Sequence, residues 1–488
     1  MPTHVPGLDV VLNGGLEPGA VVVVAGVPGT GKTILAQQIC FANATAEHKS
    51  VYYTTMTEPH TKLVRHLEQF TFFDPEALGR SVEHIHLGDL LRRGRKEGID
   101  AMVAEILAKT LDEEPAIVVI DSAKMLRDFA SERHLRSALY DLTGRFSDTG
   151  TVLLLLGEYT PRELRNDIEF SLADGIIQLE YKAREPVDRR WLRIMKMRGG
   201  SHRAGRHTFR IGIDGIEVFP RIETLIPAEV ATAESGRRHS GIPGLDELMG
   251  GGTKAGDATL ITGPSGVGKT IFGLRWVAQE LEQGKRCLFV TFQDTAEQLT
   301  GMATVFGWDH AAARASGQLV ISHVPMGDLD LDLLASTIRA ELAGPPISRV
   351  VIDSLAELAT ANRESKRFRA YVRSLVGLIR ASGASSLVTS ETNVRGFSGE
   401  VLDSLMFLFD NVISLRYVEQ GSQVGRALTV LKMRNSQHER TLSSVSITAA
   451  GLIVGAELDA VTGRLGWSAL RTQEGPPDPV RHPAPGPA

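Results

Sequence analysis

The feature that most constrains this chain is an internal repeat of short motifs. Residues 26–33, GVPGTGKT, recur as residues 263–270, GPSGVGKT. Three further motifs recur in the same order: PGLD at 6–9 and 243–246, IDS at 120–122 and 352–354, and KMR at 196–198 and 432–434. The offsets all lie between 232 and 237 residues. Ordered matches at nearly one spacing indicate a tandem duplication of a single domain of that size.

The duplication predicts how the 488 residues are organised. We expect a first domain over 1–225 and a second over 239–465. Residues 226–238 lack sustained apolar periodicity and are predicted to be a linker. The tail, 466–488, is rich in proline and is predicted to be disordered, because it has too few apolar residues to bury a core.

Composition excludes several classes of protein. Charged residues make up 23% and hydrophobic residues 42%, as in ordinary globular proteins. Two cysteines are too few for a disulfide scaffold. The amino-terminal residues do not resemble a signal peptide, and apolar runs such as 21–25 and 152–156 have the length of buried strands, not of bilayer spans. We therefore expect a cytoplasmic protein that does not enter a membrane, and the net charge of −5 does not demand a nucleic-acid partner.

Each glycine-rich motif stands between an apolar strand pattern and a helical pattern. The spacing GxxxxGK[ST] lets the backbone wrap so that its N–H groups and the helix N-terminus point at phosphate oxygens. We expect Lys32 and Lys269 to reach the β- and γ-phosphates of ATP, and the hydroxyls of Thr33 and Thr270 to bind Mg²⁺. The predicted nucleotide-binding residues are Gly26, Gly29, Thr30, Gly31, Lys32 and Thr33 in the first copy, and Gly263, Ser265, Gly266, Val267, Gly268, Lys269 and Thr270 in the second.

A carboxylate at the end of a buried strand completes the metal site in proteins with such loops. Asp121 follows the apolar run 117–120, and Asp353 follows 350–352. We predict that both hold the outer shell of Mg²⁺. The alternative for each is a plain helix N-cap.

Taken together, the four paired motifs resemble those of the KaiC family of circadian clock ATPases. Residues 173–180 and 209–220 also resemble that family, and the likeness extends over about residues 4–456. The resemblance implies two RecA-like P-loop domains, each a mostly parallel twisted sheet with helices on both faces. It also implies a homohexameric ring with ATP held between neighbouring subunits, and two-component signalling proteins as partners.

The resemblance assigns the KMR motifs to the adjacent subunit's nucleotide. Lys196 and Arg198 would reach its phosphates in one ring, and Lys432 and Arg434 in the other. In a strand, residues two apart lie on the same face, which favours a shared target for each pair. The alternative is a solvated basic strand end.

The chain departs from the family where a pair of glutamates activates the attacking water. In the second copy the pair is replaced by Gln293 and Asp294, and we expect Asp294 to position the water. In the first copy the same place reads Met56 and Thr57, although a slip of one residue brings Glu58 there. Glu58 is either this catalytic base or a surface glutamate. Hydrolysis should therefore be slow, with two unequal sites.

A second departure concerns autophosphorylation. The Ser-Thr pair that the clock protein phosphorylates falls on Met406 and Phe407, although Ser398 and Ser404 lie nearby. Three functions stay open: a ring-forming ATPase that acts as a signalling or clock-type switch, a Ser/Thr autokinase of the clock type, and a RecA/RadA-like DNA-dependent ATPase. The acidic total and the lack of a basic loop with interleaved aromatics argue against the last.

Overall fold

The computed structural model describes residues 1–54, 60–87, 97–128, 131–160, 163, 168–183, 188–225, 236–361, 365–391, 405–420, 423–434, 436–458 and 463–465. It divides into two compact units, Met1–Leu225 and Ile226–Ala488. Each is described by itself below. Arg237 and Arg238, at the end of the predicted linker, form a short strand with Thr253 and Lys254 in the second unit.

Unit 1 is built on one sheet with the strand order β3-β2-β4-β5-β1-β6-β7-β8-β9 in its described part. The first six strands in that order are parallel, and β7 to β9 extend the edge as antiparallel strands. The strands are β1 (Val21–Gly26), β2 (Ser50–Thr54), β3 (Val82–His86), β4 (Ile117–Asp121), β5 (Val152–Gly157), β6 (Gly175–Lys182), β7 (Arg189–Met197), β8 (His207–Gly212) and β9 (Gly215–Phe219). The helices are α1 (Leu8–Val11), α2 (Lys32–Asn43), α3 (His60–Leu67), α5 (Glu97–Glu113), α6 (Glu132–Thr149) and α8 (Ile168–Leu172), with 3₁₀ turns η1 (Ala123–Asp128) and η2 (Ile222–Thr224).

Unit 2 repeats this order as β14-β13-β15-β16-β12-β17-β18-β19-β20, with β21 paired to β17 and a separate β10-β11 pair. Its strands are β10 (Arg237–Arg238), β11 (Thr253–Lys254), β12 (Ala258–Thr262), β13 (Arg286–Thr291), β14 (Leu319–His323), β15 (Ile347–Asp353), β16 (Ser385–Ser390), β17 (Asn411–Gln420), β18 (Gln423–Met433), β19 (Ser443–Thr448), β20 (Gly451–Glu457) and β21 (Gly463–Leu465). Its helices are α9 (Leu245–Leu248), α10 (Lys269–Leu281), α11 (Ala296–Val305), α12 (His310–Ala315), α13 (Leu331–Ala343), α14 (Leu355–Ala361) and α15 (Ser365–Ala381), with the 3₁₀ turn η3 (Met326–Asp328).

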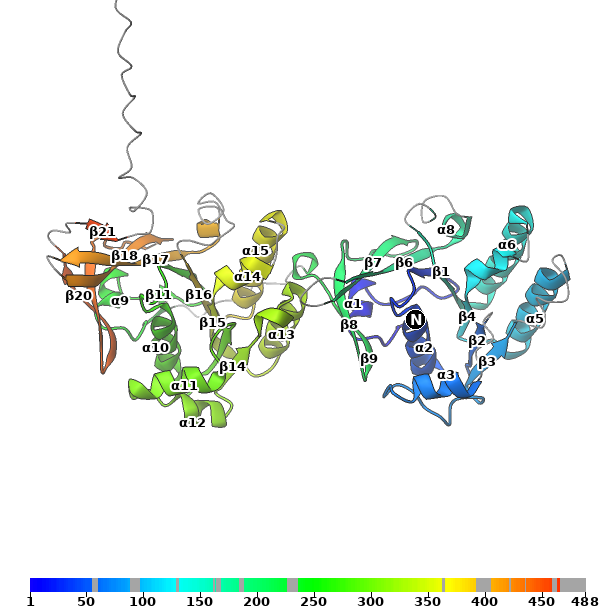
Figure 1. Ribbon diagram of the computed structural model, residues 1–488, viewed down its shortest axis with the longest axis horizontal. Helices are drawn as coiled ribbons and strands as arrows, with labels where there is room; N and C mark the ends of the chain where they lie inside the picture. Colours follow the sequence, from blue (N-terminus) through cyan, green and yellow to red (C-terminus); the bar gives the residue numbers. More distant parts are fainter. Residues whose placement is uncertain are drawn as a thin grey trace, which may run out of the picture. The chain divides into compact units, whose positions relative to one another are not determined.

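Alternation along the central strand of unit 1 places an apolar core on each face. Val22 and Val24 pack in a cluster with residues of α2, whereas Val21 and Val23 pack with residues of α5 and α6. Figure 1 shows α2 and α5/α6 on opposite sides of the strands. A continuous β-branched run suits a strand that is buried on both faces. The predicted fold class, a mostly parallel sheet with helices on both faces, is therefore confirmed.

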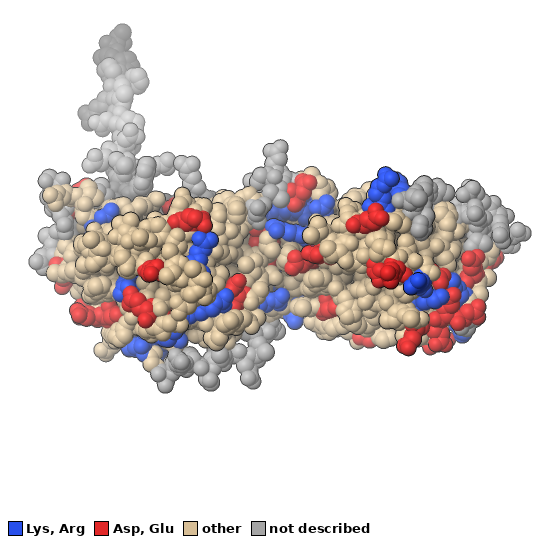
Figure 2. All heavy atoms as spheres, turned by 90° about the horizontal axis from the view of Figure 1, so that it is seen from below, with Lys and Arg blue, Asp and Glu red and all other residues tan. Residues whose placement is uncertain are grey.

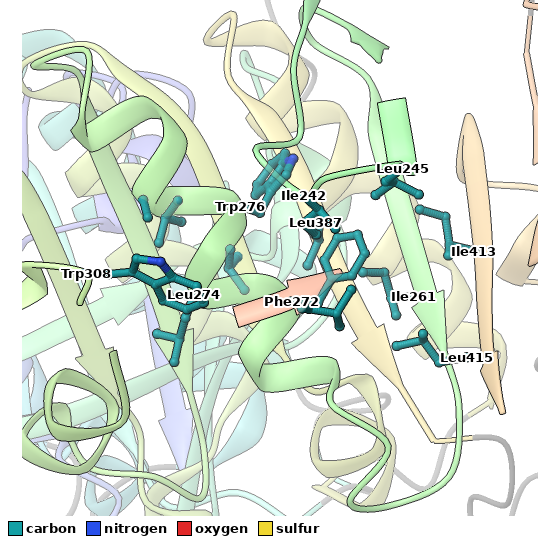
Figure 3. Close-up of a cluster of buried hydrophobic side chains, with 14 of the residues drawn as sticks. Ile242, Leu245, Ile261, Phe272, Leu274, Trp276, Trp308, Leu387, Ile413 and Leu415 are labelled. Carbon is teal, nitrogen blue, oxygen red and sulfur yellow. The ribbon is translucent and has the colours of Figure 1, made fainter. Parts of the chain in front are cut away.

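The corresponding core of unit 2 lies between α10 and its sheet. Phe272 and Trp276 of α10 pack in one cluster with Ile261 of β12 and with Ile413 and Leu415 of β17 (Figure 3). This packing anchors the helix directly behind the second glycine-rich loop. The loop is consequently held at the carboxyl end of a central parallel strand, where open α/β sheets bind their ligands.

Unit 2 also buries an ion pair that has no counterpart among the described residues of unit 1. Arg349 of β15 is fully buried, lies 3.3 Å from Glu280 of α10 and stacks its guanidinium over Trp276 at 4.4 Å. The repeat places Ile117 of unit 1 at the position of Arg349 and Asn43 at that of Glu280. The two units thus share a topology but not the chemistry of this part of the core.

Candidate functional site

Both glycine-rich loops depend on backbone conformations that glycine adopts easily. Gly29 and Gly31 have φ angles of 76° and 99°, and Gly266 and Gly268 have 73° and 112°. Most other residues would be strained there. Gly31 and Gly268 also sit at the N-caps of α2 and α10, so no side chain caps either helix. The first N–H groups of both helices therefore remain available to an anion.

Both loop lysines are hydrogen-bonded to backbone carbonyls of their own loops. The Lys32 ammonium donates to the carbonyls of Gly26 and Val27 at 3.0 and 3.1 Å. Lys269 donates to the carbonyls of Gly263 and Pro264, both at 2.9 Å. These bonds hold each ammonium against the first two residues of its loop motif.

Burial and nearby carboxylates act on these lysines in opposite directions. Burial lowers the pKa of Lys32, while the charges of Glu158 and Asp121 raise it, and the net pKa is below the usual value. The pKa of Lys269 is likewise lowered by burial, against the charges of Glu391 and Asp353. A partly desolvated ammonium of this kind gains from the approach of phosphate oxygens.

The structure joins each loop threonine to the predicted metal-site aspartate. Thr33 Oγ1 donates to Asp121 Oδ2 at 2.9 Å, and Thr270 Oγ1 donates to Asp353 Oδ2 at 2.7 Å. Hydroxyl and carboxylate oxygens are the hard donors that Mg²⁺ prefers, and such ions usually keep several water and phosphate ligands. The donor set at both loops therefore fits Mg²⁺.

The aspartates have further partners that differ between the units. Tyr52 donates its hydroxyl proton to Asp121 Oδ2 at 2.6 Å. In unit 2 Thr389 donates to the other oxygen of Asp353. Burial raises the pKa of Asp353, and the hydrogen bonds from Thr389 and Thr270 oppose this effect without cancelling it.

Each loop lines a cavity that brings most of the predicted residues together. The cavity of unit 1 has a volume of about 1170 Å³ and that of unit 2 about 230 Å³. The side chains of Thr30 and Val267 are buried beneath the loops, so these residues would contact a nucleotide through their backbone amides. The first cavity includes Gly29, Gly31, Lys32, Thr33 and Asp121; the second includes Ser265, Gly266, Gly268, Lys269, Thr270, Asp294 and Asp353.

Several cavity residues were not among the predicted site residues. Glu158 and Glu391 follow strands β5 and β16 and line the two cavities. Lys124 and Arg127 add positive charge to the cavity of unit 1, whereas Glu357 adds a carboxylate to that of unit 2. A position at the end of a strand is the sequence signal that could have found Glu158 and Glu391. Lys124, Arg127 and Glu357 lie in the segments after the aspartates, which belong to none of the four motifs.

Of the two residues predicted to position the attacking water, the structure describes only Asp294. Asp294 lines the cavity of unit 2, and its backbone N–H and carbonyl exchange hydrogen bonds with Thr291 Oγ1 at 3.2 and 3.1 Å. Glu58 lies outside the described residues, and its role stays a prediction.

The four KMR cations line neither cavity within the described part of their own units. Lys196 donates to the carbonyls of Phe170 and Ser171, and Arg198 lies 3.6 Å from Asp174. In the matching place, Lys432 donates to the carbonyls of Met406 and Phe409, and Arg434 to that of Phe407. Lysine and arginine of each pair thus contact one segment, the one that precedes β6 or β17.

These features define a class of protein: a tandem P-loop nucleotide-binding protein with two RecA-like domains. A family model described as "ATPase: KaiC" matches residues 1–223 and 238–459. The match covers nearly all of unit 1 and most of unit 2. The chain belongs to the KaiC ATPase family.

Individual relatives agree with this assignment. "Circadian clock protein KaiC3" of Synechocystis sp. is 27% identical over 97% of this chain and 95% of its own length. "Circadian clock oscillator protein KaiC" of Parathermosynechococcus lividus is 27% identical over 92% of this chain and 84% of its own. The protein of the same name from Prochlorococcus marinus is 26% identical over 92% and 91%. The likeness is thus moderate in identity and spans both repeats.

Among the helices that the structure describes, none combines the length and the apolar character needed to cross a bilayer.

Proposed function

We propose that this protein is a ring-forming ATPase that hydrolyses ATP slowly at two sites per chain and acts as a nucleotide-dependent signalling or clock-type switch. The observation that carries the proposal is the repeated assembly of loop lysine, loop threonine and strand-end aspartate. In both units the threonine hydroxyl is hydrogen-bonded to the aspartate, at 2.9 and 2.7 Å. Family membership supports the ATPase class.

In this proposal the protein contributes mainly charge and position. The loop amides and Lys32 or Lys269 bind the phosphates and stabilise negative charge as it develops on them. Thr33 and Asp121, and Thr270 and Asp353, would hold Mg²⁺, which when bound neutralises the phosphate oxygens. Asp294, and Glu58 if it reaches the first site, orient the attacking water.

The ring is supported by the KMR cations. Because Lys196, Arg198, Lys432 and Arg434 line neither cavity in the described part of their own units, we assign them to the nucleotide of the adjacent subunit. An arginine supplied in trans raises phosphoryl-transfer rates by roughly 10³–10⁵. A hexamer with nucleotide between its subunits is the assembly that this role requires, and two-component signalling proteins remain the expected partners.

The alternative functions receive less support. Met406 and Phe407 stand where the autokinase would need hydroxyls, and the side chain of Phe407 is 72% exposed. Ser398 and Ser404 lie outside the described residues. On the face drawn in Figure 2, basic and acidic side chains are interspersed, which does not favour an extended nucleic-acid surface there.

The test uses purified protein, Mg²⁺ and γ-labelled ATP, with free phosphate and protein-bound label counted in the same tube. We expect free phosphate without protein label, a partial loss in Lys32→Ala and in Lys269→Ala, and almost complete loss in the double variant. Label on the protein that disappears in Lys269→Ala would favour the autokinase instead. Release that DNA stimulates, with a steep salt dependence, would favour the DNA-dependent ATPase.

A further inference from the structure

The cavity of unit 2 contains a carboxylate that neither the loop motif nor the metal site uses. Glu357 lies in the first turn of α14 and lines the same cavity as Lys269 and Asp353. Glu357 is therefore close to the place where the terminal phosphate would lie.

Both carboxylate oxygens of Glu357 accept a hydrogen bond. Oε1 accepts from the amide nitrogen of Gln293, and Oε2 accepts from the hydroxyl of Ser354. Gln293 follows β13 and also lines the cavity, although its side chain is exposed overall. The carboxylate thus links the segment after β13 to the start of α14 within the lining of the cavity.

This contact fixes the orientation of the Gln293 amide. A glutamine side chain has one donor end and one acceptor end. When its nitrogen is bound to Glu357, its carbonyl oxygen is left to accept a hydrogen bond from another group. An oriented glutamine oxygen is a known means of holding an attacking water in nucleotide hydrolysis.

We propose that Glu357 is a positioning residue for ATP hydrolysis in unit 2, which holds Gln293 so that its oxygen aligns the attacking water beside Asp294. The inference rests on the proposed ATPase function. As the water oxygen bonds to the γ-phosphorus, the bond from that phosphorus to the bridging oxygen breaks and its electron pair leaves with ADP. One water proton stays on the inorganic phosphate and the other passes to solvent.

The aligned sequence of unit 1 carries neither residue of this pair. The residue four positions after Asp121 is Met125, whereas the residue four positions after Asp353 is Glu357. The repeat places Met56 at the position of Gln293, and Met56 lies outside the described residues. The contact between Glu357 and Gln293 is therefore specific to unit 2, and it would make the two sites chemically distinct.

A local structural role for Glu357 predicts a different result. Ser354 and Glu357 have the spacing of a capping box, in which serine and glutamate satisfy the first N–H groups of a helix. The backbone N–H of Ala356 does donate to Ser354 Oγ at 3.3 Å. A capping role alone would lower stability when Glu357 is replaced, but it would not couple to Gln293 in the rate of hydrolysis.

The experiment measures phosphate release by the full chain carrying Lys32→Ala, so that unit 2 supplies the turnover. We expect Glu357→Gln and Gln293→Ala each to lower kcat about tenfold to a hundredfold, with the Kd for ATP changed less than about threefold. The double variant should lose no more than the stronger single variant, because both act through one amide. The kcat of Glu357→Asp should lie between that of the chain with Glu357 and that of Glu357→Gln.

The matched control is Gln298→Ala, which removes the corresponding residue of the α11 capping box with Thr295 and lies outside the cavity lining. It should lower the unfolding temperature while leaving kcat unchanged. The inference is overturned if Glu357→Gln leaves the kcat of the active Lys32→Ala chain unchanged. It is also overturned if the losses in kcat of Glu357→Gln and Gln293→Ala multiply in the double variant. In both cases the proposed ATPase function is unaffected. If the wild-type chain itself releases no phosphate, the proposed function fails, and the inference fails with it.

Discussion

At the residue scale, the hydroxyl of Thr270 has two roles: it donates a hydrogen bond to Asp353, and it is a metal ligand in the proposed site. It donates to Asp353 at 2.7 Å, and with Thr389 and Lys269 it opposes the rise that burial causes in the pKa of this carboxyl. The same oxygen is a metal ligand in the proposed site. A hydrogen bond to a charged group contributes roughly 1.5–3 kcal/mol. Loss of the hydroxyl would therefore remove both this bond to the aspartate and one ligand of the metal.

We therefore expect Thr270→Val to weaken Mg²⁺-dependent ATP binding at unit 2 by about tenfold or more, while metal-free ATP binding changes little. Titrations with and without Mg²⁺ in the Lys32→Ala chain would measure the difference. Thr300→Val is the control, because the Thr300 hydroxyl bonds only to carbonyls of its own helix among the contacts described. Equal losses with and without Mg²⁺ would contradict a metal-binding role for Thr270.

At the scale of elements, the buried ion pair joins β15 to α10. Glu280 is 2% exposed and contacts Arg349, Lys285 at 2.9 Å and the hydroxyl of Ser348 at 2.6 Å. Burial alone would raise the pKa of Glu280, but Ser348 and the two cations bring it below its usual value. A carboxyl whose folded pKa is lowered stabilises the fold above its unfolded pKa and loses that contribution as pH falls through the folded pKa.

Glu280→Ala should destabilise unit 2 by about 3–5 kcal/mol, because it leaves Arg349 buried without its carboxylate. The loss should shrink on acidification, as the wild-type carboxyl is protonated. Denaturant unfolding at neutral and acid pH would measure it. The double variant Arg349→Ile with Glu280→Asn, which copies unit 1, should recover much of the loss; a double variant as unstable as Glu280→Ala would show that the charges are not the cause.

The same scale shows which parts of the site the sequence could predict. The glycine-rich loops, their threonines and the strand-end aspartates were predictable, because each belongs to a short motif whose spacing has a physical reason. Each motif also occurs twice in the chain. The contact between Gln293 and Glu357 was not, because the two residues are 64 positions apart and belong to no shared motif. The burial of Arg349 was equally hidden, since its charge opposes the apolar pattern of β15, and its partner lies on another element.

At the scale of the whole molecule, each unit contains one internal thiol. Cys40 of α2 and Cys287 of β13 are both fully buried, and burial raises the pKa of each to about 12. Since the thiolate is the reactive form, neither should react at neutral pH while its unit is folded.

We expect a thiol reagent at pH 8 to leave the native chain unlabelled and to modify each cysteine as its own unit unfolds. Labelling followed by mass spectrometry along a denaturant series would report the two units separately. Cys40→Ala and Cys287→Ala identify which thiol reacted first. Rapid labelling of either cysteine without denaturant would contradict the burial described here.

In both units the register of the sheet links the strand before the glycine-rich loop to the strand that carries the KMR lysine. In unit 1, Val23 of the loop-bearing strand pairs with Ile176, and Ile176 pairs with Lys196. In unit 2, Leu260 pairs with Val412, and Val412 with Lys432. Each KMR lysine therefore lies two strands, about 10 Å, from the strand that carries its own loop. In the proposed ring, this hydrogen-bonded link of two strands would couple the nucleotide that a subunit binds to the nucleotide that its KMR lysine contacts in the neighbouring subunit.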